Sequence, residues 1–466
     1  MRVKISDKIY ITNPTNDILV WCDYNLILVN PIWQTLSKLG KEDTIRRKHI
    51  PEKIKCYIVN DDTIAIPYGC LYGIWKYIKN EKIDLEFNNH SDISIANVEC
   101  PVELFDYQEE AVSNMINAKG GILTAGCGAG KTFMGIEILR RIGKRFLWLT
   151  HTSDLLRQTL SEMKGLYPKL DVGLITEGEI KIGKDGAIAT VQTLSKIDSR
   201  IYSKEFDVVM VDECHRAVGS PTNVKMFSKI IENIPARYKY GLTATPSRSD
   251  TMINSLYMLL GLSKDGHFQP TFHIDKSKVK TMVAEHTMIE LDTPIDYESD
   301  VFDIDGTLIY NNLINFLSYN EERNKKIVEN VIKCNNEGRK QVVLCHRVDH
   351  CKILNEMLLQ KGLNSTLIIG ATKAKDREDI LKQRINWDIL IATYSLLKEG
   401  VNVKQLDTLH LTTPQKDKGM IVQCVGRIER YLEGKKQPIA YDYVDVNYSY
   451  CLGAYKKRKS SIKNRF

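Results

Sequence analysis

Several features that would define other protein classes are missing from this sequence. No run of about eighteen apolar residues occurs, and the amino-terminal stretch MRVKISDKIYITNP lacks the apolar core of a signal peptide. The eleven cysteines include no Cys-x-x-Cys pair, and the closest two, Cys345 and Cys351, fit no common zinc pattern. We therefore expect reduced thiols in an intracellular, cytoplasmic protein that has no membrane partner.

A strong charge of either sign is also missing. The chain has 65 Lys and Arg against 58 Asp and Glu, a net charge of +7. This excess is compatible with a nucleic-acid partner, but solubility explains it equally well. The hydrophobic fraction of 43% excludes wholesale disorder, and 466 residues favour several domains, each with its own core.

Two stretches of the chain alternate short β-branched runs with amphipathic segments. The first stretch contains GILTA, RFLWLT, AIATV, DVVMVDE and YGLTAT, and the second contains QVVLC, STLIIG, DILIAT, TLHLT and PIAYDYVDV. Ahead of the second set, the segment NKKIVENVIKCNNEGR places apolar residues on one helical face. This rhythm predicts an α/β fold class, with two tandem domains that each carry a mostly parallel sheet between helices.

The remaining segments are less regular. Residues 1–98 contain strand-like pieces (KIYIT, DILVWCDYNLILV, KCYIV, TIAIP) and few helical patterns before CLYGIWKYI, which predicts a small α+β module. The β-like segment KVKTMVAEHTMIELDTPIDYE fits neither repeat. We predict an amino-terminal module at 1–98, a first α/β domain at 99–310 and a second at 311–466.

The stretch AGCGAGKT, residues 125–132, lies between a predicted strand and a predicted helix. Its glycines allow successive backbone N–H groups to face a phosphate: Gly126, Gly128 and Gly130. Lys131 adds a positive charge at the phosphates, and the Thr132 hydroxyl can bind Mg²⁺. The alternative is a glycine-rich turn followed by Lys-Thr by chance.

A hydrophobic strand is followed by DECH, residues 212–215. At a strand's carboxyl end Asp212 is placed to hold Mg²⁺ through water, and Glu213 to orient and deprotonate an attacking water. His215 is placed to link this site to another. An Asp-Glu pair at a solvated strand end is the alternative when the pair is considered alone.

Together AGCGAGKT, DECH, GLTATP and QCVGRIER resemble motifs I, II, III and VI of superfamily-two helicases, in the family's order. Motif I of that family often begins with alanine, as Ala125 does here. The resemblance covers residues 101–460 and implies two RecA-like domains, ATP and Mg²⁺ as cofactors, and a nucleic acid as partner.

The resemblance also implies roles for residues outside those four stretches. Gln108, in LFDYQEEAV, would recognise adenine, and Gly400 and Asn402 would lie near the nucleotide. Thr243 and Thr245, with His215, would couple the nucleotide site to the strand-binding face. The implied nucleic-acid contacts are Thr150, His151, Thr190, Gln192, His346, Arg347 and Thr393. For the segments around Thr150 and Thr190, a buried strand followed by a helix cap is the alternative.

QCVGRIER carries Gln423, Arg427 and Arg430 at helical spacing, which predicts that all three project from one face. The planar fork of arginine suits the neutralisation of a phosphoryl group in transfer, so these residues are catalytic candidates. An exposed basic face held by Glu429 is the alternative.

The flanking segments NPIWQTLSKLGK, HIPEKIKCYIV and TIAIPYGCL resemble the phage UvsW-like and XPB-like branch of DNA helicases. Relatives tend to carry Pro-Arg-Gly where this chain has Pro67-Tyr68-Gly69. The branch implies an ATP-dependent DNA helicase or translocase of replication, recombination or repair, moving 3′ to 5′, with residues 1–98 as an accessory DNA-binding module.

The sequence leaves three alternative functions open, and it leaves the role of the basic carboxyl-terminal stretch undecided. An RNA helicase uses the same motifs, and a nucleotide-gated clamp would lack Lys131, Glu213 or Arg427, which are all present. A restriction or nuclease subunit would need a further carboxylate-rich metal site, and the sequence reveals none. The basic end AYKKRKSSIKNRF is expected either to touch nucleic acid or to be a solvated tail.

Overall fold

The computed structural model describes residues 1–87, 94–95, 103–126, 128–217, 229–244, 252–279, 281–295, 300–303, 305–382, 385–396 and 403–463. It divides into two compact units, Met1–Gly126 with Gly130–Val279, and Cys127–Ala129 with Lys280–Phe466. The predicted three-domain boundaries at 98/99 and 310/311 stay predictions. No helix in the described part of the chain is long and apolar enough to cross a membrane.

The first unit contains a parallel sheet of seven strands. Their order is β10 (Val172–Ile175), β11 (Gly186–Thr190), β9 (Phe146–Thr150), β12 (Val208–Val211), β13 (Tyr238–Thr243), β8 (Gly120–Thr124) and β14 (Phe272–His273). Helices follow the strands: α5 (Asp106–Ala118), α6 (Lys131–Ile142), α7 (Ser153–Leu166), α8 (Val191–Leu194) and α10 (Ile253–Leu260). The predicted parallel α/β fold is confirmed.

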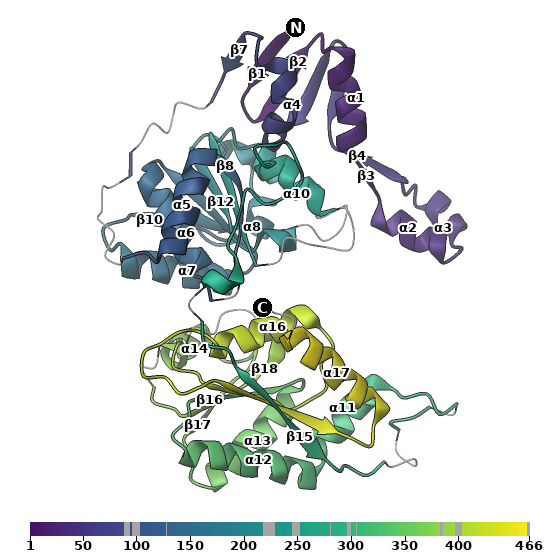
Figure 1. The fold of residues 1–466 in the computed structure, drawn as a ribbon, viewed down its shortest axis with the longest axis vertical. Helices are drawn as coiled ribbons and strands as arrows, with labels where there is room; N and C mark the ends of the chain where they lie inside the picture. Colours follow the sequence, from purple (N-terminus) through teal and green to yellow (C-terminus); the bar gives the residue numbers. More distant parts are fainter. Residues whose placement is uncertain are drawn as a thin grey trace. The chain divides into compact units, whose positions relative to one another are not determined.

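Helices flank this sheet (Figure 1), and neighbouring residues of β9 pack against different ones. Leu147 and Leu149 join a core cluster that includes Leu256 and Leu260 of α10. The intervening Trp148 lies on the opposite face of the sheet, against α6: a Cβ built on Gly135 of that helix would lie 2.8 Å from the Trp148 ring. Alternate strand residues are thus buried under different helices, as a doubly covered sheet requires.

The amino-terminal module carries a separate mixed sheet in the order β5 (Ile58–Asn60), β6 (Thr63–Pro67), β2 (Lys8–Thr12), β1 (Arg2–Ile5) and β7 (Ile83–Leu85). Helices α1 (Asn16–Asn25) and α4 (Leu71–Ile78) accompany it. The strand-like interpretation of DILVWCDYNLILV was wrong over α1, where the buried residues Ile18 and Cys22 are four apart and share one helical face.

A short arm extends from this module (Figure 1). Strands β3 (Ile27–Val29) and β4 (Lys53–Lys55) pair antiparallel, and between them lie α2 (Pro31–Lys38) and α3 (Glu42–Arg47). Neither arm helix has a buried residue. The sequence predicted few helices here, and this was wrong: α2 and α3 are only eight and six residues long, too short for a helical period to stand out in the sequence.

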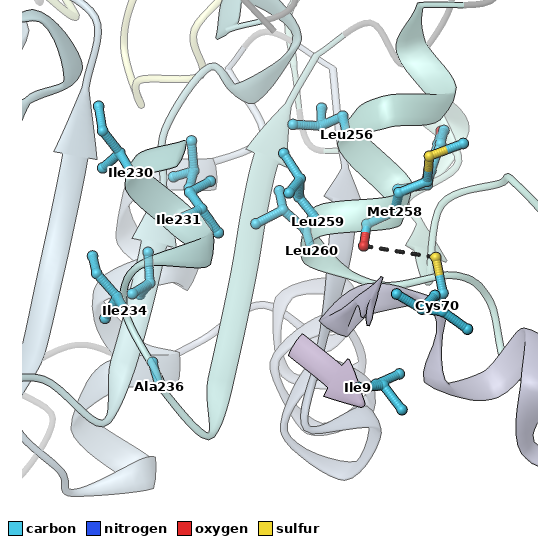
Figure 2. Packing of buried hydrophobic residues seen from close by; sticks show 14 of the residues in the cluster. Ile9, Cys70, Ile230, Ile231, Ile234, Ala236, Leu256, Met258, Leu259 and Leu260 are labelled. Carbon is cyan, nitrogen blue, oxygen red and sulfur yellow. Dashed lines mark hydrogen bonds between the residues drawn. The ribbon is translucent and has the colours of Figure 1, made fainter. Parts of the chain in front are cut away.

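The module packs on the first parallel-sheet domain through the segment Pro67–Cys70. A Cβ built on Gly69 would lie 2.6 Å from three backbone atoms, those of Tyr257, Met258 and Gly261. The Leu262 amide donates to the Gly69 carbonyl over 2.9 Å, and the Cys70 thiol donates to the Met258 carbonyl over 3.9 Å (Figure 2). Only glycine permits this approach of two backbones.

The second unit holds a six-stranded parallel sheet. The order is β15 (Glu285–Leu291), β20 (Ile439–Asp445), β19 (Thr408–Leu411), β16 (Gln341–Cys345), β18 (Ile389–Thr393) and β17 (Ser365–Ile368). The helices are α11 (Tyr310–Tyr319), α12 (Glu321–Asn336), α13 (Val348–Gln360), α14 (Ala374–Leu381), α16 (Lys418–Ile428) and α17 (Ser449–Lys463). The segment KVKTMVAEHTMIELDTPIDYE, which fitted neither repeat in the sequence, contains β15 and so belongs to this second sheet.

The basic carboxyl-terminal stretch forms α17 and packs against the second sheet. Cys451, Ala454 and Arg458 are buried, and the Arg458 guanidinium donates to the Asp442 carboxylate of β20 over 2.6 to 3.0 Å. A buried arginine is stable in such a place when a carboxylate balances its charge. The solvated-tail alternative is therefore wrong for residues 449–463.

Candidate functional site

Five neighbouring strands of the first sheet end at one edge, and the predicted motifs follow them directly. Along this edge the order is β11, β9, β12, β13 and β8. Carboxyl ends of parallel strands form the usual binding edge of such a sheet. Motif II after β12 therefore lies next to motif III at the end of β13, and motif III lies next to motif I after β8.

The phosphate-loop candidate bends sharply before α6. Gly128 and Gly130 have φ angles of +85° and +82°, in the left-handed region that favours glycine. Lys131 begins α6, and its ammonium donates to the carbonyls of Ala125 over 3.2 Å and Gly126 over 3.4 Å. Thr132 follows in the first helical turn. The loop therefore presents a helix amino terminus and one cation at the sheet edge.

Asp212 is buried at the end of β12, with a relative exposure of 8%. Its carboxylate accepts a hydrogen bond of 2.9 Å from the Glu213 amide. Burial first, and then the charge of Glu213, raise the pKa of Asp212 to about 7 against the opposing charge of Lys131. A carboxylate so poorly solvated is suited to bind a cation, and the charge of Lys131 in motif I acts on this carboxylate of motif II.

Glu213 and His215 connect motif II to motif III. Glu213 has a φ of +46°, which is uncommon for a residue with a Cβ. Its Oε2 lies 3.3 Å from the Nδ1 of His215, and the same nitrogen lies 2.7 Å from the Thr243 hydroxyl. His215 thus bridges a catalytic candidate and the end of β13, as the predicted coupling role requires.

Gln108 lies against the phosphate loop. It is buried in the first turn of α5, and its side-chain oxygen accepts from the Phe105 amide over 3.2 Å. A Cβ built on Gly130 would come within 2.7 Å of its Nε2. The predicted adenine-recognition residue and the predicted phosphate loop are therefore neighbours.

A small cleft contains two of the predicted nucleic-acid residues together with motif II. It is lined by Leu149, Thr150, His151, Val191, Val211, Asp212 and Glu213. The Gln192 amide nitrogen lies 3.5 Å from the His151 ring. The hydroxyl of buried Thr150 donates to the Thr152 carbonyl over 3.2 Å, and that of Thr190 accepts from the Thr193 amide over 3.1 Å. Both hydroxyls therefore support local backbone, as a cap does.

The motif VI residues are not all on one helix. Gln423 and Arg427 lie in α16, which ends at Ile428, and Arg430 forms a β-bridge with Thr281. The prediction that three side chains share one helical face was wrong for Arg430. The buried Glu429 carboxylate accepts from the Ala284 amide over 2.8 Å, which pins the segment before β15 and ends the helix.

The other predicted residues of the second unit also follow strand ends. His346 and Arg347 come after β16, and the hydroxyl of Thr393, at the end of β18, lies 3.1 Å from that of Ser395. Gln423 in α16 has a buried side-chain oxygen without a hydrogen-bond partner among the described residues. Thr245, Gly400 and Asn402 lie outside the described residues.

Sequence reasoning missed the residues that surround His346. Tyr310, Thr413 and Gln415 all lie within hydrogen-bond distance of its ring. They come from segments separated by about thirty to seventy positions in the chain, so no local spacing could reveal the contact. In the described part of the chain, no group of three or more His, Cys, Asp or Glu side chains could hold a metal ion, and nine cysteines are free thiols.

Two family models match the chain. Residues 101–248 match the model described as type III restriction enzyme, res subunit. Residues 322–431 match the helicase conserved C-terminal domain. The chain belongs to helicase superfamily two. These two segments carry motifs I to III and the motif VI residues of the helicase.

Two relatives of this helicase are named for different nucleic acids. The "Putative ATP-dependent RNA helicase L396" of Acanthamoeba polyphaga mimivirus is 26% identical and covers 92% of this chain and 85% of its own length. The "DNA 3'-5' translocase XPB2" of Sulfurisphaera tokodaii is 28% identical and covers 40% of each chain. The crystal structure of T4 UvsW aligns at 18% identity over 100% of this chain and 98% of that one, with a TM-score of 0.41.

Proposed function

We propose that this helicase couples ATP hydrolysis to movement along DNA, or to its remodelling, in replication, recombination or repair. The observation that carries the proposal is that Lys131, after β8, and Asp212 and Glu213, after β12, lie on one sheet edge with only β13 between the two strands. The DNA-directed name of the Sulfurisphaera relative supports DNA as the track and 3′ to 5′ as the direction.

The residues of this edge fit ATP and Mg²⁺. The left-handed glycines leave room beside the backbone N–H groups, and buried Asp212 lacks a compensating ion pair in the described part of the chain. Lys131 and the α6 amino terminus would hold phosphate oxygens, while Thr132 and Asp212 would hold the metal. The metal supplies charge neutralisation at the phosphates when it is bound.

Glu213 would accept the proton of the attacking water. Its carboxylate is half-buried, and its Oε2 lies 3.3 Å from the Nδ1 of His215. Because His215 also contacts Thr243, a change at Glu213 would be transmitted to motif III. In the second unit Gln423, Arg427 and Arg430 remain the catalytic candidates, and the two arginines are suited to stabilise the charge of a transferred phosphoryl group.

An RNA helicase is the second candidate, and a specific observation favours it. The mimivirus relative, which aligns over 92% of this chain, is named for RNA. Both candidates use the same nucleotide chemistry, so Lys131, Asp212 and Glu213 do not distinguish them. The alternative of a nucleotide-gated clamp would hydrolyse ATP slowly or not at all.

The arm formed by residues 27–55 supports a DNA-binding role for the amino-terminal module. Five basic residues and two acidic residues lie between Asn30 and Glu52. No residue of α2 or α3 is buried, so these side chains are available to a partner. We propose that the arm contacts the phosphate backbone of duplex or branched DNA.

Strand displacement tests the track and its direction. Duplexes with one 3′ or one 5′ single-stranded tail, made of DNA or of RNA, would be incubated with the protein and ATP. We expect displacement on DNA with a 3′ tail and little effect of base sequence, because phosphate contacts do not read bases. Activity on RNA alone would favour the second candidate, and activity from 5′ tails alone would overturn the direction.

A further inference from the structure

The carboxyl ends of three adjacent strands in the second sheet bring four separate segments together. Strands β20, β19 and β16 are neighbours in that order. His346 and Arg347 follow β16, Gln415 and Lys416 follow β19, and Tyr450 follows β20. Tyr310, at the start of α11, approaches the same place through its hydrogen bond to His346.

His346 is the uncharged centre of this cluster. Its Nδ1 lies 2.9 Å from the Thr413 hydroxyl, and its Nε2 lies 3.1 Å from the Tyr310 hydroxyl and 3.4 Å from the Gln415 amide nitrogen. Burial lowers the pKa of His346 to about 4, so the ring is neutral at physiological pH. Because the Gln415 amide nitrogen can only donate, Nε2 accepts and Nδ1 carries the proton.

Gln415 fixes the loop that presents Lys416. Its side-chain oxygen accepts from the Lys416 amide over 2.8 Å and from the Asp417 amide over 2.9 Å. The guanidinium of Arg458 donates to the Gln415 carbonyl over 3.2 Å. Since Arg458 is buried on Asp442, it attaches the loop to both α17 and β20. The backbone of Lys416 is therefore held by these hydrogen bonds, one of which comes from a buried arginine.

Three cations around this centre have no carboxylate partner in the described part of the chain. The Lys416 ammonium lies 3.4 Å from the centre of the Tyr450 ring. Desolvation lowers the pKa of Lys416, and the positive charge of nearby Lys457 lowers it further. Arg347 donates to two neutral amide oxygens, those of Asn311 and Asn315, each over 3.1 Å.

The nearby carboxylates are already engaged. Asp417 accepts from the Met420 amide over 2.9 Å and so caps α16. Asp349 accepts from the Lys352 ammonium over 3.3 Å. By contrast, the buried arginines Arg323 and Arg458 are each paired with an aspartate. The surface cations thus form a set that is paired with no carboxylate among the described residues and is available to an external anion.

We propose that Arg347, Lys416 and Lys457 form a phosphate-binding surface for one nucleic-acid strand, with α17 as a part of the grip. This inference rests on the proposed nucleic-acid-dependent function. Arg347 was implied by the resemblance and Lys457 lies in the basic carboxyl-terminal stretch, whereas Lys416 lies outside every segment that the sequence singled out. The surface has no base-reading device, so the grip is independent of sequence and releases readily, as a stepping protein requires.

The test compares two double variants of the full-length protein. K416Q/K457Q removes two charges from the surface. K326Q/K333Q removes two from α12, whose packing contacts form a different core cluster from those of α16 and α17. Affinity for fluorescein-labelled oligo-dT, and for oligo-U, would be measured by anisotropy at increasing salt concentration. Melting temperatures establish that each variant is folded.

We expect K416Q/K457Q to bind several-fold more weakly than wild type at low salt, and to lose about 1 to 2 units of the logarithmic salt slope. The α12 variant should keep the wild-type slope. If wild type binds the strands and K416Q/K457Q binds with the same affinity and slope, the inference is wrong while the proposed function stands. If wild type binds neither strand, the proposed function and the inference both fail.

Discussion

Glu213 is both the proposed catalytic base and a residue with an uncommon backbone conformation. Its φ of +46° costs free energy for a side chain of this size, on the order of 1 kcal/mol. The conformation turns the chain directly after β12, so that Asp212 and Glu213 serve different purposes although they are adjacent. Asp212 is buried beside Lys131, whereas Glu213 reaches His215.

Substitution of Glu213 and Lys131 should therefore separate binding from chemistry. Glu213→Gln keeps the shape of the side chain and leaves Lys131, Thr132 and Asp212 in place, so we expect ATP binding to persist while hydrolysis falls about a hundredfold or more. Lys131→Ala should weaken both. Equilibrium binding of a fluorescent ATP analogue and steady-state phosphate release measure the two effects. Near-normal hydrolysis by Glu213→Gln would exclude Glu213 as the base.

Lys239 is a buried cation where the amino-terminal module meets β13. Its relative exposure is 1%, and its ammonium donates to the Ile231 carbonyl over 3.0 Å. The ring of Tyr68 lies 5.2 Å from the same ammonium. Desolvation lowers the pKa of Lys239 to about 8, although the charges of Asp7 and Glu232 act in the opposite direction and that of Lys8 adds to the lowering.

This buried lysine predicts a pH dependence of stability. Between pH 8 and about 10.5 the unfolded chain holds a proton on Lys239 that the folded chain has released, so the free energy of unfolding should rise with pH. Relative to Lys239→Met, the rise should approach about 3 kcal/mol. Denaturant unfolding of both proteins across this range measures it. Parallel pH profiles for the two proteins would show that Lys239 is not responsible.

At the scale of elements, the contact between η1 (Tyr68–Cys70) and α10 makes the module part of the first unit. Tyr68 donates through its hydroxyl to the Arg237 carbonyl over 3.0 Å, and Lys8 pairs with Glu232 over 3.0 Å. Relatives of the branch tend to carry arginine at this position, whereas Tyr68 here joins the module to the first parallel-sheet domain. A fragment of residues 99–466 would expose the apolar surface of α10 and of the residues after it, including Met258 and Leu262, and we expect it to be unstable.

The arm offers a cleaner test of DNA binding by the module. Replacing residues 31–52 by one glycine leaves Asn30-Gly as a two-residue turn between the paired residues Val29 and Lys53. Because no residue of the arm helices is buried, the melting temperature should change little. Affinity for duplex and forked DNA should fall about tenfold at low salt. Unchanged affinity for both substrates would assign the arm to another partner.

The helices and strands differ in how well they can be predicted from their local sequence. Every strand of the two large sheets that the sequence predicted is present, because buried parallel strands read as unbroken β-branched runs bounded by polar residues. Strand β15 was left unassigned since it alternates polar and apolar residues at a sheet edge. The end of α16 at Ile428 depends on Glu429 meeting a distant backbone amide, which no local pattern reveals.

At the scale of the whole molecule, sequence order and spatial order are different. Motifs I, II and III follow one another in the chain, but in the sheet β13 separates β12 from β8, so motif III lies between the other two. The motifs could be identified from sequence because each ends a strand with an unusual residue set. The His346 cluster could not, since it is assembled from four segments of the second unit.

The central claim is that nucleic acid controls ATP hydrolysis in this protein. The most direct measurement is the steady-state ATPase rate of the full-length protein alone and with single-stranded DNA, duplex DNA, forked DNA and RNA, with Glu213→Gln as the blank. We predict a low ATPase rate for the protein alone, an increase of about tenfold or more with DNA, and a smaller increase with RNA. A rate that no nucleic acid changes would contradict the account.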